Sequence, residues 1–321
     1  MENLVSRLRL AGIRFAHLIA VLFGVSFLVY LLLDLLPGDT AEVIVASSAN
    51  PTEDAVEEIR KQLGLDQPLL VRFFGWFGNA LQGDLGMSFR TGQAVTEAIA
   101  ERLPVTLQLL LMAEVVSLAI AIPLAIAAAK RRDAMFDKVT AVFAFGLQSI
   151  PNFVVALVSI VIFSVMLGWL PAIGFVPMNE GLWENIKSLI IPTLALSAGL
   201  IPLYMRVLRN EMIRVLQEDF ILVARSQGLK SRTVLFRYAL KPSLPTLVTV
   251  VGINIGTLIG GTIIIELISG LPGIGTLLYA AINNRDYVLV QGVILFVAAA
   301  YVVANFLVDI FYTILDPRVE A

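Results

Sequence analysis

Long apolar blocks separated by polar segments dominate the pattern along the chain. A helix needs about 20 mostly apolar residues to cross the hydrocarbon core of a membrane. Six blocks fit this requirement, the fourth being the shortest: Phe15–Leu36, Leu103–Ala129, Val139–Leu167, Ser188–Met205, Leu244–Ile268 and Val288–Leu315. Each block is continuous rather than alternating between apolar and polar positions, so it predicts a helix and not a membrane β-strand. The expected fold class is an all-α polytopic membrane protein with six transmembrane helices.

The composition agrees with a membrane protein and excludes several kinds of site. Of the 321 residues, 58% are hydrophobic and 15% are charged, against about 45–50% and about 25% in soluble domains. The chain has no cysteine, which excludes disulfides, a thiol nucleophile and cysteine-based metal sites. Its single histidine, His17, excludes a multi-histidine metal site. A net charge of −2 argues against a nucleic-acid binder.

The distribution of Lys and Arg predicts the orientation, because these residues are enriched in cytoplasmic segments. Sixteen of the 23 fall on one side of the expected helices: three before the first helix, four in 130–138, eight in 206–243, and Arg318. Both termini are therefore expected in the cytoplasm. The first block is longer than the roughly 7–15 apolar residues of a signal peptide, and no A-x-A site follows it. We interpret it as a retained helix.

These assignments divide the chain into four regions. They are a cytoplasmic N-terminus with the first helix (1–36), an extracytoplasmic loop (37–102), a five-helix transmembrane domain (103–315) and a cytoplasmic tail (316–321). In the loop, Asn50-Pro51-Thr52-Glu53 and Gly64 are start and stop signals that predict a surface helix over Pro51–Leu63. Aromatic residues at 73, 74, 76 and 77 favour a membrane boundary. The loop is interpreted as a packed cap, a docking surface for an extracytoplasmic partner, or both.

The cytoplasmic segment 206–243 is basic and too long for a simple turn between two helices. It carries eight basic and three acidic residues. Residues 219–228 predict a helix that contains Ala224 and stops at Gly228, and residues 230–238 predict a second short helix. We call this helix–glycine–helix unit, Asp219–Tyr238, the elbow. It suits insertion into a groove on another protein, and its charge equally suits contact with anionic lipid.

The elbow and several other stretches of the chain resemble those of a known family. Ala224-Arg225-x-x-Gly228-Leu229 and Arg237-Tyr238-Ala239-Leu240-Lys241 resemble the cytoplasmic "EAA" coupling loop of permease subunits of binding-protein-dependent ABC importers. Further stretches resemble the peptide/nickel branch, in the subunit type with a long first external loop, and they occur in the same order along nearly the whole chain. They begin at Leu36, Leu63, Gly83, Arg102, Ser149, Leu271, Asn284 and Asp316.

The resemblance implies a type I ABC importer transmembrane fold in the cytoplasmic membrane. It implies a second related permease, two ATPase subunits that bind ATP and Mg²⁺, an extracytoplasmic binding protein and surrounding lipid as partners. No cofactor is expected in this chain. The residues that the resemblance assigns to coupling with the ATPases are Asp219, Ala224, Arg225, Gly228, Leu229, Lys230 and Arg232. The chain departs from the motif at Leu222 and Val223, where the glutamate and the first alanine would fall.

Several residues inside the expected helices are candidates for packing or for the translocation pathway. Gly252, Gly256 and Gly260 recur on one face, and small residues at this spacing let helices approach closely. Glu114 lies near a bilayer centre and is interpreted in three ways: an interhelical hydrogen bond, a cavity-lining group for a cationic substrate, or a proton relay. The residues expected near helix ends are His17, Asp34, Glu266 and Asp309. Prolines at 123, 151, 192, 202 and 245 predict bends.

The sequence predicts that the chain does not hydrolyse ATP by itself. Gly228-Leu229-Lys230-Ser231 lacks the spacing of a phosphate-binding loop, and no nucleophile is paired with a base. The expected function is the permease subunit of an ABC importer for small peptides, driven by ATPases acting through the elbow. An alternative is a proton-coupled secondary transporter that uses Glu114, although no convincing internal repeat supports it. A membrane scaffold is a third possibility.

Overall fold

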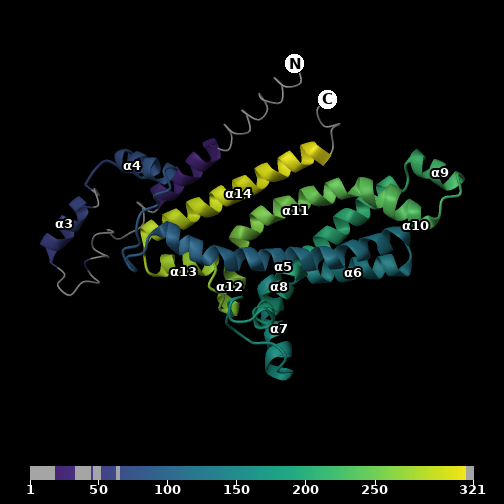
Figure 1. The fold of residues 1–321 in the computed structure, drawn as a ribbon, viewed down its shortest axis with the longest axis horizontal. Coiled ribbons are helices and arrows are strands. Elements are labelled where there is room, and N and C mark those ends of the chain that lie inside the picture. The colour runs from purple at the N-terminus through teal and green to yellow at the C-terminus, as the bar shows by residue number, and fades with distance from the viewer. Residues whose placement is uncertain (1–18, 33–44, 46–51, 63–65, 316–321) are drawn as a thin grey trace, which may run out of the picture. The chain divides into compact units, whose positions relative to one another are not determined.

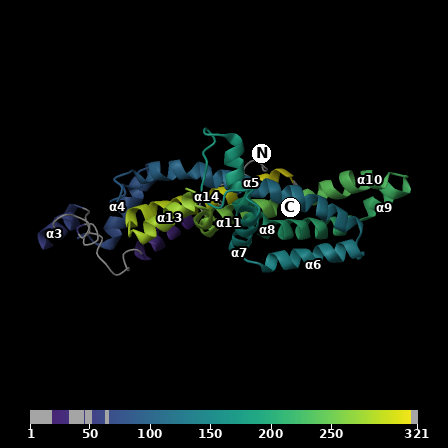
Figure 2. The ribbon, with the colours of Figure 1, turned by 90° about the horizontal axis from the view of Figure 1, so that it is seen from below.

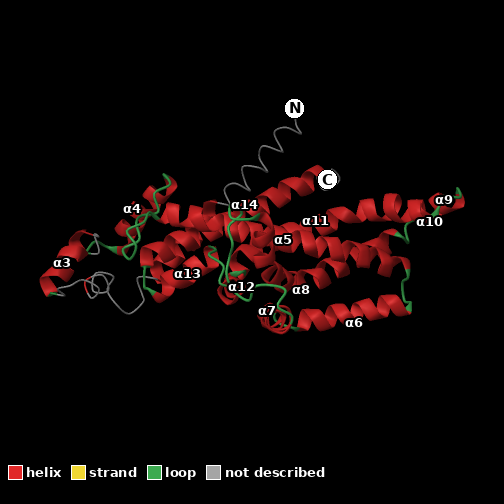
Figure 3. Cartoon of the chain, turned by 60° about the horizontal axis from the view of Figure 1, so that its bottom comes forward, coloured by secondary structure: helices red, strands yellow, loops and turns green. Residues whose placement is uncertain are grey.

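The computed structural model describes residues 19–32, 45, 52–62 and 66–315, and most of these residues are in helices (Figures 1 and 3). No strand occurs among them, and the extended pairing is limited to an isolated bridge between Met87 and Ala94. Contacts group the chain into two compact units, residues 1–104 with 273–303 and residues 105–272 with 304–321. The all-α fold class is confirmed.

The first unit contains the N-terminal helices and most of the last helix. They are Ile19–Leu32, α3 (Glu53–Gln62), α4 (Leu69–Leu81), the start of α5 (Val95–Lys130), α13 (Ile274–Asn283) and most of α14 (Tyr287–Leu315). The predicted surface helix is confirmed as α3; the ends predicted at Pro51 and Leu63 lie outside the described residues.

The aromatic residues of α4 pack against the first apolar helix. Phe73 is fully buried, and its ring lies 5.5 Å from Phe23, 5.1 Å from Phe27 and 5.6 Å from Tyr30, measured between centroids. Such edge-to-face pairs stabilise the packing by more than the burial of their apolar surface alone. These contacts favour the packed-cap interpretation of the loop, and a docking role of its exposed surface stays a prediction.

The second unit is built around α8 (Leu182–Val215). This helix packs against α6 (Met135–Ser149), α7 (Asn152–Ser159), α11 (Lys241–Gly261) and α12 (Ile263–Ser269). Figure 2 shows α6 running beside α8. Small residues Ala195, Ser197 and Ala198 are buried at the middle of α8, where small side chains let helices approach closely.

Two of the expected spans are broken rather than straight. Residues Met135–Ser149 and Asn152–Met166 form a pair bent by 93°, and Ser231–Leu258 with Ile263–Ser269 form a pair bent by 62°. The first bend lies at Pro151, which forces Ile150 into an extended conformation (φ −91°, ψ 123°). The second follows Gly260-Gly261, and glycine has low helix propensity. The expectation of single helices over Val139–Leu167 and Leu244–Ile268 is therefore wrong.

Helix lengths also differ from the apolar blocks. Among the described residues, three helices are long and apolar enough to cross a membrane: Val95–Lys130, Leu182–Val215 and Tyr287–Leu307. Up to five spans result in this part of the chain if each bent pair counts as one. Val95–Lys130 starts earlier than the apolar block at Leu103, and Leu182–Val215 extends past the end of its block at Met205, because polar residues continue a helix beyond its apolar part. The six-span count and the orientation stay predictions. Of the five prolines, Pro151 coincides with a break, while the others lie inside or at the start of continuous helices.

Candidate coupling surface and interior polar sites

The elbow follows α8 and leads directly into α11. It comprises α9 (Asp219–Ser226), the turn at Gly228, α10 (Ser231–Thr233) and most of η2 (Val234–Leu240), a stretch of wider helix. The predicted helix–glycine–helix unit is confirmed. Its second helix continues without interruption into α11, so the fifth apolar helix begins at Ser231 and not at Leu244. The elbow lies at the end of α11 that is remote from α12 (Figures 1 and 3).

The turn at the corner of the elbow has a local cause. Gly228 has φ +77°, a left-handed conformation that disfavours side chains with a Cβ. Its N–H donates to the carbonyl of Arg225 at 2.9 Å, and the N–H of Leu229 donates to the carbonyl of Ala224 at 3.3 Å. This pair of bonds is the Schellman arrangement that ends helices at glycine. Gly228 therefore stops α9 and turns the chain.

The elbow has a packed inner side and an exposed outer side. Ile221, Ala224 and Val234 are buried together, with Leu229 packed against them. On the outer side of α9, Leu222 is 62% exposed and Val223 is 54% exposed, and Phe220 is also exposed. The two positions that depart from the family motif thus lie on the accessible face.

The candidate coupling residues divide between these two sides. Ala224, Gly228 and Leu229 form the interior and the turn of the elbow. Asp219, Arg225, Lys230 and Arg232 are exposed. Their role in coupling stays a prediction, but the exposed four are placed where a partner could reach them.

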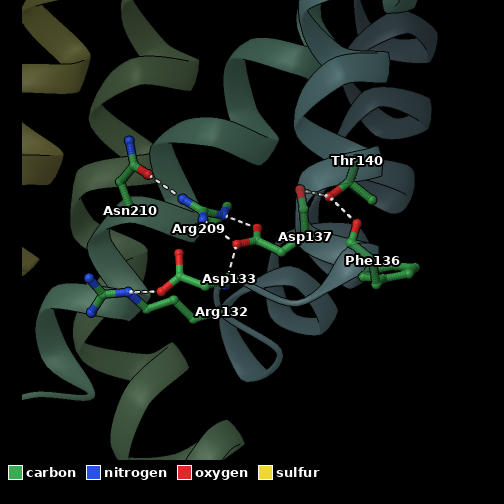
Figure 4. A network of polar contacts seen from close by, with 7 residues as sticks. All are labelled: Arg132, Asp133, Phe136, Asp137, Thr140, Arg209 and Asn210. Carbon is green, nitrogen blue, oxygen red and sulfur yellow. Dashed lines mark hydrogen bonds and ion pairs between the residues drawn. The ribbon is translucent and has the colours of Figure 1, made fainter.

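An ion pair absent from the sequence-based expectations joins α6 to α8 near the elbow. Arg209 Nε lies 2.5 Å from Asp137 Oδ1, and Arg209 Nη2 donates to Asp137 Oδ2 at 2.5 Å (Figure 4). The backbone N–H of Asp133 also donates to Asp137 at 2.9 Å. Asp137 is 3% exposed. The sequence signal is a pair of carboxylates, Asp133 and Asp137, within a basic loop, and nothing in the sequence indicates that Arg209 is the partner of Asp137.

Glu114 is part of an interhelical contact between α5 and α8. Tyr204 Oη donates to Glu114 Oε1 at 2.8 Å, and both residues are buried. Within the described residues, Glu114 Oε2 has no hydrogen-bond partner. The interhelical hydrogen bond, one of the three interpretations of Glu114, is thus present. The other two stay untested.

The remaining candidates in the apolar helices have mixed environments. Glu266 is fully buried and accepts hydrogen bonds from Thr106 at 2.7 Å and Thr262 at 3.1 Å, as expected of a structural residue. Gly252 and Gly256 are buried, whereas Gly260 is exposed, so the glycine stripe is only partly at a packing surface. His17, Asp34 and the side chain of Asp309 lie outside the described part of the chain.

Comparison with known proteins assigns the family. Residues 121–321 match the family of binding-protein-dependent transport system inner membrane components, and residues 8–110 match the N-terminal region of such membrane components. The chain belongs to this family. It is therefore a component of the inner membrane, and the secondary-transporter alternative gains no support.

Relatives match the permease over almost its full length. A protein named as a peptide transport system permease in Brucella abortus is 43% identical over 309 residues, covering 96% of this chain and 97% of the relative. The dipeptide transport system permease protein DppB of Alkalihalophilus pseudofirmus is 34% identical over 327 residues, covering 96% and 98%.

A solved structure shows the same fold. The inward-facing MetNI methionine ABC transporter matches with a TM-score of 0.55 at 19% identity, over 68% of this chain and 96% of that chain. The match shows that the permease has the type I ABC importer transmembrane fold.

Proposed function

We propose that this permease imports small peptides as part of an ABC transporter. The observation that carries the proposal is near full-length similarity to peptide and dipeptide permeases, at 34–43% identity in the two relatives described above. In this arrangement it pairs with a second permease, two ATPase subunits dock on the cytoplasmic side, and a binding protein delivers the peptide from outside. ATP is hydrolysed in the ATPase subunits and not in this chain.

The elbow is proposed to transmit the movement of the ATPases. Its buried inner cluster and its continuity with α11 allow it to move with that helix rather than as a loose loop. The exposed apolar side of α9 and the cations Lys230 and Arg232 provide the contact surface. Burial of apolar side chains supplies affinity, and charged groups at the rim supply orientation.

The test is purification of the tagged full-length permease from its native membrane in mild detergent, followed by identification of stoichiometric partners. A second permease with ATPase subunits is expected. The complex is then reconstituted in vesicles with its binding protein, and ATP-dependent uptake is measured for dipeptides, longer peptides and nickel chelates. Uptake of none of the peptides, or a chain that transports without any ATPase, contradicts the proposal.

A further inference from the structure

A cavity of about 420 Å³ lies between the elbow and the ends of α5 and α8, within the second unit. Its lining includes three cations: Lys130 and Arg132 from the end of α5 and the turn after it, and Arg225 from α9. Gln217 and Ser231 add polar groups. The cavity therefore collects positive charge from two segments that are 95 residues apart in sequence, counted from Lys130 to Arg225.

The positive charge of this cavity is only partly compensated by acidic neighbours. No Asp or Glu is among its lining residues in the described chain. Arg132 lies 3.4 Å from Asp133, whose side chain is 82% exposed. The nearby Glu211 and Glu218 are both paired with Arg214, at 2.6 Å and 3.1 Å. A net positive pocket of this kind attracts an anion.

The rest of the lining is apolar, which narrows the chemistry of the ligand. Ile213, Leu216, Leu229, Val234 and Leu235 form this part of the cavity. A small free anion gains nothing from apolar walls, whereas an amphiphile with an anionic head does. Basic pockets between helices on the cytoplasmic side are suited to lipid head groups.

The position of Lys130 along α5 also suits binding of a lipid head group. Lys130 directly follows the apolar run Leu103–Ala129, in which Glu114 is the one charged residue. The first cation after an apolar run lies where the hydrocarbon core gives way to the head groups. Arg132 follows Lys130 closely in the sequence, and Arg225 of α9 lines the same cavity.

We propose that this pocket binds the head group of an anionic phospholipid, with its phosphate among Lys130, Arg132 and Arg225. One phosphate contacted by α5 and by α9 ties the elbow to the transmembrane helices. Bound lipid thereby makes the elbow, on which the ATPases act, more rigid. The proposal rests on the expected cytoplasmic orientation of the elbow, and it is independent of which substrate is imported.

The test measures lipid binding without ATP, peptide or transport, so its failure is distinguishable from failure of the proposed function. The full-length permease, with any partners that co-purify, is delipidated and incubated with phosphatidylglycerol or phosphatidylcholine. Bound lipid is counted by native mass spectrometry. The pocket variant combines Lys130→Gln, Arg132→Gln and Arg225→Gln. The control variant combines Arg131→Gln, Lys138→Gln and Arg237→Gln, which are exposed cations outside the cavity lining and remove the same charge.

Each cation near a lipid surface contributes roughly a fivefold gain in affinity. We expect the permease to bind phosphatidylglycerol in preference to phosphatidylcholine. The affinity for phosphatidylglycerol should fall roughly a hundredfold in the pocket variant and much less in the control variant. If the triple variant does not fold, judged by circular dichroism and elution profile, the single Lys130→Gln and Arg132→Gln variants should each lose about fivefold.

Three results overturn the proposal. Equal loss in the pocket and control variants means that general surface charge attracts the lipid. Equal binding of phosphatidylcholine and phosphatidylglycerol means that the anionic head is not recognised. Displacement of the lipid by inorganic phosphate at constant ionic strength means that the pocket takes a free anion.

Discussion

Removing the guanidinium of Arg209 should destabilise the permease strongly, because it leaves a buried carboxylate without its main partner. Asp137 has a side chain that is 4% exposed, and Arg209 contacts both of its oxygens at 2.5 Å. Breaking one partner of a buried pair costs about 3–5 kcal/mol. Arg209 is 21% exposed and the Asp133 N–H remains as a donor, so we expect Arg209→Met to lose about 3 kcal/mol, the lower end of that range.

The assay is equilibrium unfolding of the purified chain in mixed micelles, followed by circular dichroism. Arg214→Met is the matched control, since Arg214 also pairs with carboxylates but its side chain is 62% exposed. Exposed pairs contribute about 0–1 kcal/mol. The double variant Asp137→Leu with Arg209→Met should recover most of the loss, because no unpaired charge is then buried. The reasoning is refuted if Arg209→Met costs no more than Arg214→Met, or if the double variant is as unstable as the sum of the two single changes.

Three further predictions concern close packing and the turn of the elbow. Ala224→Leu should overpack the inner cluster and destabilise the permease by about 1–3 kcal/mol, while Val223→Leu on the exposed side should leave the stability unchanged; equal thermal unfolding temperatures of the two variants contradict the packed elbow. Gly228→Val should impair coupling of ATP hydrolysis to uptake more than Gly228→Asn, because asparagine tolerates positive φ; reconstituted vesicles compare the two, and equal defects count against the turn. Gly292→Ala places a Cβ 2.5 Å from Val95 Cγ1 and should lower the thermal unfolding temperature, whereas Gly146→Ala meets nothing within 4 Å and should not.

The elbow shows how much could be predicted from local sequence. The residue composition of 219–228 predicts a helix, and Gly228 predicts its end, because the Schellman bonds form between residues that are close in sequence. The surface helix α3 was predictable for the same reason, from start and stop signals on either side of it. Where the second helix of the elbow ends was not predictable, since Pro242 and Pro245 are normally read as helix boundaries, and here both lie within the first turns of α11.

The interior polar contacts could not be read from the sequence. Glu114 stood out as a carboxylate in an apolar run, but its partner Tyr204 is 90 positions away. Asp137 and Arg209 are separated by 72 positions, and Thr106 and Glu266 by 160. A polar residue in an apolar helix needs a partner, and which partner it finds depends on which helix faces are brought together.

Hydropathy and local residue signals were enough to predict the class of protein, the approximate positions of most apolar helices and the elbow with its glycine turn. These depend on how each residue partitions between water and an apolar phase and on hydrogen bonds between near neighbours. The tertiary structure decided where helices bend, how far they extend past their apolar runs, and which charged and polar side chains meet. Hydropathy predicts that a residue avoids water but not which helix it packs against. The cavity shared by Lys130 and Arg225 therefore follows only from the tertiary structure, which brings α5 and α9 together.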